Sequence, residues 1–186
     1  LARELARMRS HRAVDRQNSL YQRYPELWLE SRVRTFIQEV DASLQAAPIY
    51  GQVPAFAGGE RGVIDLLAVD CGGRLAVLEL KAAEDIHLPL QALDYWIRVK
   101  WHLEQGDFRA NGYFPGIQIV NTPPRILLVG PSLAFHPSID VILRFFSPDI
   151  PVTRVGLAMN WRERLKVVFQ NQGGTAPAWN EGECKS

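Results

Sequence analysis

The sequence predicts an α/β fold, with a mixed central β-sheet flanked by helices. Two short runs of branched aliphatic residues, 63–69 and 75–81, stand on either side of a glycine pair and are typical of adjacent buried strands in a hairpin. Apolar residues recur at helical spacing before this hairpin, from about 25 to 44, and after it, from 88 to 104. With 186 residues, of which 47% are hydrophobic, the chain is long enough to bury one sizeable core.

The other elements follow from the same signals and fit one domain. In chain order we expect an Arg-rich helix in 1–24, a helix from about Pro25 to Leu44, a strand at 49–56, the hairpin, the helix at 88–104, a loop at 106–124, a strand at 125–130, a helix at 137–146, and a second hairpin of 152–159 and 165–170. The chain thus divides into an Arg-rich N-terminal segment at 1–24, one domain at 25–170, and a flexible C-terminal tail at 171–186.

The helix at 88–104 has a start signal and two candidate faces. Asp85 is placed to cap it, and Pro89 falls in its first turn, where proline is favoured. The face expected to pack on the core consists of Leu90, Leu93, Ile97 and Trp101. A second face is polar and consists of Gln91, Tyr95, Arg98 and His102. Because the helix directly follows the first hairpin, this polar line is expected to lie over the end of that hairpin.

Charged residues interrupt both strands of the first hairpin. Asp65 stands within the first run, and Glu79 and Lys81 stand within the second. Because side chains alternate along a strand, Glu79 and Lys81 share one face. If Asp65 lies across from Glu79, two carboxylates and an ammonium group converge where burial without a partner is costly. Two hard oxygen donors suit Mg²⁺, and a lysine beside them suits phosphodiester hydrolysis.

Each of these groups also has a simpler interpretation. Glu79 and Lys81 form an ion pair at a sheet edge, with Asp65 an unrelated surface acid. Arg98 and His102 either reach a phosphate backbone or belong to the solvated face of an amphipathic helix. The aromatic residues of the loop at 106–124 either stack on unpaired bases or, as we favour, anchor the loop to the core; they include Phe108, Tyr113 and Phe114.

Taken in order, Asp65, the Glu79-Leu80-Lys81 triplet and Gln91-x-x-x-Tyr95 resemble the PD-(D/E)XK nuclease superfamily, also called the restriction-endonuclease-like fold. The resemblance is to the branch with a Gln-x-x-x-Tyr helix, as in RecB-type nuclease domains, and it spans about 26–105. It departs at Ile64, which replaces the proline of the family motif. It implies a restriction-endonuclease-like mixed sheet and Mg²⁺-dependent hydrolysis of DNA, with Mn²⁺ able to substitute.

The resemblance also implies roles for single residues. Asp65 and Glu79 would bind the catalytic Mg²⁺, and Lys81 would assist the attacking water. Gln91 and Tyr95 would orient the substrate or the lysine. These five residues are therefore the catalytic candidates of the chain.

Two points about the function stay open in the sequence. Many members of the family place a further acid on the helix before the sheet, and Glu30 matches it as a third metal ligand, although a solvated glutamate is the alternative. A non-catalytic module that binds nucleic acid or a protein on the same fold is the competing function. RNA is a further candidate substrate, because metal-assisted attack does not by itself distinguish the two sugars.

Charge and cysteine content say less about partners. The net charge is +1, but residues 1–24 hold six arginines against two acids, which suits an arm on phosphate, a solvated helix or a linker. The two cysteines, Cys71 and Cys184, suggest neither a disulfide framework nor a zinc site. No apolar run approaches the roughly 18 residues of a membrane span, and no signal peptide is visible, so we expect a cytoplasmic protein of undetermined oligomeric state that binds DNA rather than a membrane.

Overall fold

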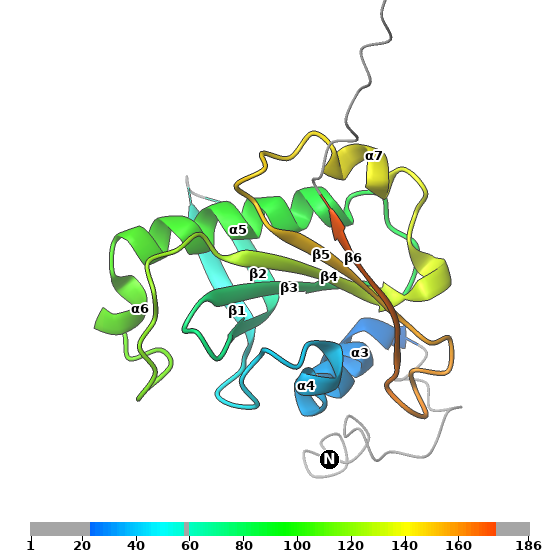
Figure 1. Cartoon of the computed structure of the whole chain (residues 1–186), viewed down its shortest axis with the longest axis horizontal. Coiled ribbons are helices and arrows are strands. Elements are labelled where there is room, and N and C mark those ends of the chain that lie inside the picture. The colour runs from blue at the N-terminus through cyan, green and yellow to red at the C-terminus, as the bar shows by residue number, and fades with distance from the viewer. Residues whose placement is uncertain (1–22, 58–59, 174–186) are drawn as a thin grey trace, which may run out of the picture.

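Six strands pair into one mixed β-sheet (Figure 1). The computed structural model of the chain describes residues 23–57 and 60–173. The strands are β1 (Tyr50–Ala57), β2 (Glu60–Val69), β3 (Leu75–Leu80), β4 (Arg125–Pro131), β5 (Val152–Leu157) and β6 (Val167–Gly173). They lie side by side in chain order, and β4 is parallel to both of its neighbours while the other pairs are antiparallel. The predicted α/β fold with a mixed central sheet is confirmed.

Helices cover both faces of the sheet, with α3 and α4 on one face and α5 on the other (Figure 1). The helical segments are α3 (Pro25–Thr35), α4 (Ile37–Val40), α5 (Leu88–Glu104), α6 (Asp107–Ala110), η1 (Ser132–Ala134, a 3-10 turn) and α7 (Ile139–Leu143). Within the described ranges, no helix combines the length and the apolar character that a membrane crossing requires. The Arg-rich helix predicted for 1–24 falls almost wholly outside the described residues, as does most of the predicted tail.

The helix predicted from Pro25 to Leu44 is broken in two. Phe36, with φ −119° and ψ 38°, is not helical, and the second piece ends at Val40. The Phe36 ring packs against the core under the guanidinium group of Arg32, whose carbon lies 4.7 Å from the ring centre. Both pieces turn apolar side chains towards the sheet, and the break brings the Phe36 ring against the core as well.

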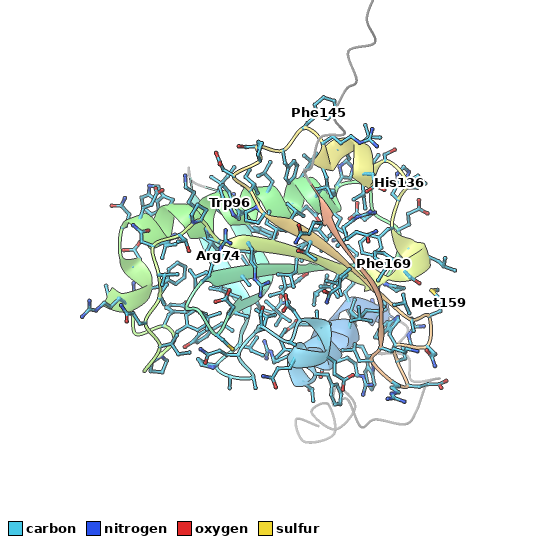
Figure 2. All side chains as sticks on the ribbon, in the orientation of Figure 1. Arg74, Trp96, His136, Phe145, Met159 and Phe169 are labelled. Carbon is cyan, nitrogen blue, oxygen red and sulfur yellow. The ribbon has the colours of Figure 1, made fainter. Side chains whose placement is uncertain are left out.

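The helix predicted at 137–146 is reduced to α7. Ile139 and Leu143 are buried on its inner side, whereas Phe145 is 85% exposed and projects away from the body of the molecule (Figure 2). Phe146 lies beyond the helix but packs in the same core cluster as Ile139 and Leu143, so the segment stays against the core after the helical turn ends. The last strand, by contrast, runs to Gly173, three residues beyond the predicted hairpin.

Strand β3 lies inside the sheet and is buried along its whole length. Leu78 and Leu80 pack in the cluster that includes Leu29 and Val33 of α3, and Val77 packs in the cluster on the α5 side. This alternation is the period of two expected for a strand. Glu79, two residues after Val77, therefore faces the α5 side of the sheet.

Helix α5 begins as predicted, at Leu88, but Asp85 does not cap it. The N-cap position is held by His87, and no side chain caps the helix there. The Asp85 Oδ1 atom instead accepts a hydrogen bond from the His87 backbone N–H at 2.8 Å. Because Asp85 stands three residues before the helix, its side chain closes a local turn and leaves its second oxygen available to other groups.

The predicted packing face of α5 is wrong for three of its four residues, since of these four only Leu93 is partly buried and packs against the core. Leu90, Ile97 and Trp101 are 50%, 53% and 52% exposed, whereas the buried face carries Leu88, Ala92, Trp96 and Val99. Trp96 lies between α5 and the sheet, where its ring N–H donates to the Pro124 carbonyl oxygen at 2.7 Å (Figure 2). Since apolar residues occur at helical spacing on both sides of α5, periodicity alone does not select the side that packs.

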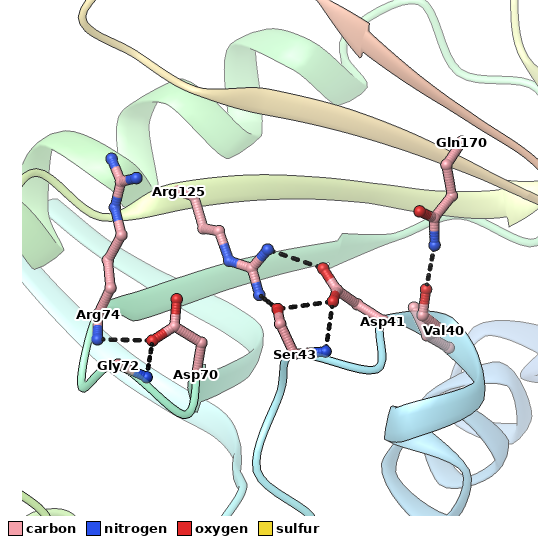
Figure 3. Close-up of polar contacts among 8 residues, drawn as sticks. All are labelled: Val40, Asp41, Ser43, Asp70, Gly72, Arg74, Arg125 and Gln170. Carbon is pink, nitrogen blue, oxygen red and sulfur yellow. Dashed lines mark hydrogen bonds and ion pairs between the residues drawn. The ribbon is translucent and has the colours of Figure 1, made fainter.

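A polar clamp ties the segment after α4 to the sheet (Figure 3). Arg125, at the start of β4, donates to Asp41 Oδ2 at 2.7 Å and to Ser43 Oγ at 2.8 Å. Burial opposes ionisation of Asp41, but hydrogen bonds from Ser43 and the Arg125 cation outweigh it and lower the pKa of Asp41. On β6, the Gln170 amide donates to the Val40 carbonyl oxygen at 2.6 Å. The end of α4 is thus held by two different strands.

The turn of the first hairpin is closed by Asp70. Its Oδ1 atom accepts backbone hydrogen bonds from Gly72 at 2.8 Å and from Arg74 at 3.0 Å (Figure 3). Gly73 has φ +84°, a left-handed conformation that favours glycine. The glycine pair of the sequence therefore does mark the hairpin turn.

The aromatic residues of the loop at 106–124 anchor it to the core, as favoured from the sequence. Phe108 and Phe114 are 8% and 1% exposed. Tyr113 stacks against Tyr50 of β1 with ring centres 4.8 Å apart, and the Phe114 backbone N–H donates to the Tyr50 hydroxyl at 3.1 Å. These rings are engaged within the protein.

Candidate active site

Strands β2 and β3 separate at the position of the two predicted acids. Their ladder pairs Val69 with Leu75 and ends at Leu66 with Leu78, so one further step would place Asp65 across from Glu79. The Asp65 side chain connects the two strands at this opening, because its Oδ2 atom accepts a hydrogen bond from the backbone N–H of Leu80 at 2.9 Å. The hairpin prediction that brings Asp65 beside Glu79 agrees with this register.

Glu79 is a buried acid without a full set of partners. It is 4% exposed, and its Oε2 atom has no hydrogen-bond partner among the described residues. Burial, followed by the negative charge of Asp65, raises the pKa of Glu79 to about 9. A carboxylate at this position is costly unless a proton or a cation accompanies it.

Asp65 shares this environment to a lesser degree. Burial, together with the charge of Glu30, raises the pKa of Asp65 to about 6 against the lowering effects of the Leu80 N–H and of Lys81. Two neighbouring acids oppose each other's ionisation. The pair therefore favours a positive charge placed between its members.

Lys81 supplies a positive charge next to the acids. Its backbone N–H donates to the Val129 carbonyl oxygen of β4 at 3.1 Å, and its Nζ lies 3.4 Å from Asp85 Oδ2. Burial lowers the pKa of Lys81, but the charges of Glu26, Glu79 and Asp85 outweigh it and raise the pKa. Lys81 is thus a stable ammonium group that donates hydrogen bonds rather than a base.

The simpler interpretation of Glu79 and Lys81 as an ion pair at a sheet edge is wrong in both parts. In the described part of the chain, the ion pair of Lys81 is with Asp85. Strand β3, which carries Glu79, lies inside the sheet between β2 and β4. Asp65 is likewise not an unrelated surface acid, because its charge acts directly on the Glu79 carboxyl group.

Tyr95 and Gln91 approach this cluster from α5. The Tyr95 hydroxyl is hydrogen-bonded to the backbone of Val63, and burial followed by the charge of Glu79 raises the pKa of Tyr95. Its ring lies against Gly62, where an added Cβ would meet ring atom Cε1 at 2.6 Å. Gln91 stands one turn earlier on the helix, and its buried Oε1 atom has no partner within the described structure.

Glu30 approaches from α3, on the opposite layer. It is 9% exposed, and its two oxygens accept hydrogen bonds from Arg34 at 3.0 Å and from Gln52 of β1 at 2.9 Å. Burial raises the pKa of Glu30 against the lowering effects of these two partners. Because its charge acts on Asp65, Glu30 belongs to the cluster and is not a solvated helix residue.

Two residues of the cluster were not found by sequence reasoning. Glu26 is exposed in the first turn of α3, and its charge acts on Asp65, Glu79 and Lys81. Its spacing of four from Glu30 was an available signal, because i and i+4 share a helix face. Gln52 carried no signal, since its role depends on a backbone conformation that the sequence does not reveal.

Arg98 and His102 pair with acids outside the cluster. Arg98 is 5% exposed and donates to Asp94 at 2.9 Å. His102 Nδ1 lies 2.6 Å from Asp107 Oδ2, two turns beyond Tyr95 and hence about 10 Å further along the helix. Contact of these two side chains with nucleic acid stays a prediction.

The donor set suits a hard divalent cation more than zinc. Among the described residues, no group of three or more His, Cys, Asp and Glu side chains is arranged to hold a metal directly. Mg²⁺ commonly takes only one or two protein carboxylates and completes its shell with water and substrate. Asp65 with the unpartnered oxygen of Glu79 fits that pattern.

Comparisons with known proteins add little to this geometry. No protein-family model matches the chain, and no curated protein matches it. Among solved structures, the chain is similar to the crystal structure of a repair endonuclease from Pyrococcus abyssi, at 21% identity and a TM-score of 0.44. The alignment covers 62% of this chain and 40% of the endonuclease chain. A likeness of this degree says nothing about activity, so the chemistry rests on the residues themselves.

Proposed function

We propose that the protein is a Mg²⁺-dependent nuclease that hydrolyses DNA phosphodiester bonds. The observation that carries the proposal is the buried, unpartnered oxygen of Glu79 beside Asp65, at the opening between two strands. A protein interior tolerates such a pair when a cation completes it. Lys81 adds a stable ammonium group at the same place, which suits a substrate that carries negative charge.

Each side chain of the site would have a separate role in hydrolysis. Asp65 and Glu79 would hold the Mg²⁺, which when bound polarises a phosphoryl oxygen and acidifies a water molecule. Lys81 donates a hydrogen bond that orients the attacking water and offsets the charge that grows on the phosphate. Gln91 and Tyr95 position the substrate from the α5 side. Water adds to phosphorus as the bond to one sugar oxygen breaks, and that oxygen leaves with a proton.

A panel of nucleic acids tests the proposal. Linear, circular, single-stranded, flapped and mismatched DNA, together with an RNA strand, are incubated with Mg²⁺ or Mn²⁺ and the wild-type protein. We expect metal-dependent cleavage of at least one DNA, reduced by at least about 1,000-fold in Asp65→Ala and Lys81→Ala, since both would remove charge stabilisation at the reacting phosphate. The exposed acid Asp149 lies outside the cluster, so Asp149→Asn serves as the matched control.

Two outcomes would contradict the proposal. Cleavage that survives in both Asp65→Ala and Lys81→Ala would exclude these residues from the chemistry. Binding of DNA without cleavage of any substrate, together with crystals soaked in Mn²⁺ that show no ion between Asp65 and Glu79, would favour the non-catalytic module on the same fold.

A further inference from the structure

The backbone of β1 departs from a regular strand at Gln52. This residue has φ +52°, and among the described residues only Phe114 is another non-glycine with a positive φ. The register of β1 with β2 pairs Gly51 with Leu66 and Val53 with Ile64, but the intervening pair of Gln52 and Asp65 is missing. A left-handed non-glycine residue is unfavourable and persists where surrounding contacts hold it. The irregularity lies directly opposite Asp65.

The left-handed conformation directs two consecutive residues of β1 towards the same helix. In a regular strand, Gly51 and Gln52 would face opposite sides of the sheet. Here a Cβ at Gly51 would overlap the Arg34 guanidinium and lie 2.6 Å from Glu30 Oε1, and the Gln52 Nε2 atom donates to Glu30 Oε2 at 2.9 Å. Glycine at 51 therefore leaves room for the ion pair of Arg34 and Glu30, and Gln52 holds the second oxygen of Glu30.

Glu30 depends on these contacts for its orientation. One of its oxygens is held by Arg34, whose side chain is 43% exposed, and the other is held by Gln52 from the sheet. Arg34 lies on the same helix as Glu30 and packs against Gly51, whereas Gln52 gives the carboxylate a hydrogen bond from the strand next to Asp65. Loss of the Gln52 amide would leave Glu30 Oε2 without its hydrogen bond and the carboxylate held by Arg34 alone among the described contacts.

We propose that Gln52 is a positioning residue that holds Glu30 next to Asp65, so that Glu30 acts as a third acid on the divalent cation. This inference rests on the proposed function and deepens it. Because the acids are not arranged as three direct ligands, Glu30 acts through the water shell, which Mg²⁺ and Mn²⁺ retain in large part. Outer-shell partners of this kind typically change metal affinity by about 10- to 100-fold.

Gln52→Gly isolates the amide from the backbone. Glycine adopts a positive φ without strain, so this variant keeps the course of β1 and removes only the hydrogen bond to Glu30. Gln45→Gly is the matched control, since it deletes the same amide at a site where it donates to the Asp70 carbonyl oxygen, outside the cluster. Gln52→Asn is a second variant that tolerates the left-handed conformation but is too short to keep the contact.

The measurement is the affinity of each protein for Mn²⁺ alone, by calorimetry and by electron paramagnetic resonance, without substrate. We expect Gln52→Gly and Gln52→Asn to bind Mn²⁺ about tenfold more weakly than the wild type, and Gln45→Gly to bind equally well. In a Glu30→Gln background, Gln52→Gly should have no further effect, because the residue acts through Glu30.

Different results would overturn different statements. Wild-type affinity in Gln52→Gly, or an equal loss in the Glu30→Gln background, would overturn the role of Gln52 while Mn²⁺ binding and cleavage by the wild type stand. Failure of the wild type to bind Mn²⁺ would instead overturn the proposed function, and this inference with it.

Discussion

A carboxyl group buried as deeply as that of Glu79 is accommodated either by a proton or by a cation. Its raised pKa, about 9, indicates the first solution for the protein without metal, and its unpartnered oxygen offers room for the second. Asp65, with a pKa of about 6, follows the same pattern less strongly. The two acids therefore link metal binding to the release of protons.

The stability of the metal-free protein should fall with rising pH. Since the folded-state pKa values of Asp65 and Glu79 lie above their ordinary values of 3.8 and 4.5, the folded protein binds more protons than the unfolded chain between those limits. The stabilising effect is complete below pH 4 and is lost as the pH rises towards 9. Glu79→Gln removes the part of this dependence that comes from Glu79 and should be more stable than the wild type at pH 8, by about 1–3 kcal/mol.

Urea unfolding with a chelator at pH 4.5 and pH 8 measures this difference. The gain from Glu79→Gln should shrink towards zero at the lower pH, where the wild-type carboxyl group is already neutral. Glu39→Gln, an exposed glutamate on α4, should show no such trend. A Glu79→Gln protein less stable than the wild type at pH 8 would contradict the burial argument.

At the scale of single elements, α5 joins the core to the site. Its inner face carries Leu88, Ala92 and Val99 against the sheet, and Tyr95 on the neighbouring line reaches the acids. The apolar side chains on its outer face are half exposed and contribute little to packing. Stability and site geometry thus depend on the same side of one helix.

Two leucines in the first turns of α5 test which face packs. Leu88 is 2% exposed and Leu90 is 50% exposed. Leu88→Ala should lower the free energy of unfolding by about 2–4 kcal/mol because it leaves a cavity, and Leu90→Ala should lower it by less than about 1 kcal/mol. Thermal or urea unfolding of the two variants gives the comparison. Equal losses would mean that the outer face also packs, for example against a partner.

Sequence patterns predicted the elements better than their orientation. The strands of the first hairpin were recognisable because their aliphatic runs are bounded by turn residues. Asp65 and Glu79 were recognisable because they interrupt those runs. The packing side of α5 was not, because both of its sides are apolar, and neither was the break at Phe36, which tertiary packing imposes. The role of Gln52 could not be predicted, because no sequence pattern indicates that a glutamine adopts a positive φ.

At the scale of the whole molecule, the sheet holds the layers together through a few polar contacts. The clamp of Arg125 with Asp41 joins the segment after α4 to the middle of the sheet (Figure 3). The sequence predicted a mixed sheet, but the order of the strands and this clamp depend on contacts between residues 84 positions apart. Such distant pairs are not visible in local patterns.

The clamp should stabilise the protein at neutral pH. Asp41→Asn is expected to lower the free energy of unfolding by about 1–2 kcal/mol at pH 7, because it weakens charge-assisted hydrogen bonds between two side chains that are each 17% exposed. Since the folded-state pKa of Asp41 is lowered, this contribution is present above pH 3.8 and is lost as the pH falls through the folded-state pKa. Unfolding curves at pH 7 and pH 3 check both parts; a constant difference would contradict the assignment.

The reacting groups at the opening between β2 and β3 come from one short stretch of the chain. Asp65, Glu79, Lys81, Gln91 and Tyr95 all belong to one continuous hairpin and the helix that follows it. Their relative spacing is therefore set by neighbours in the chain, and the outer hairpin of β5 and β6 takes no part in it. The loop between those two outer strands packs Trp161 and Leu165 in the same core cluster as Leu29 and Val33 of α3, so a change in that loop acts on the helix of Glu30 and not directly on the five reacting groups.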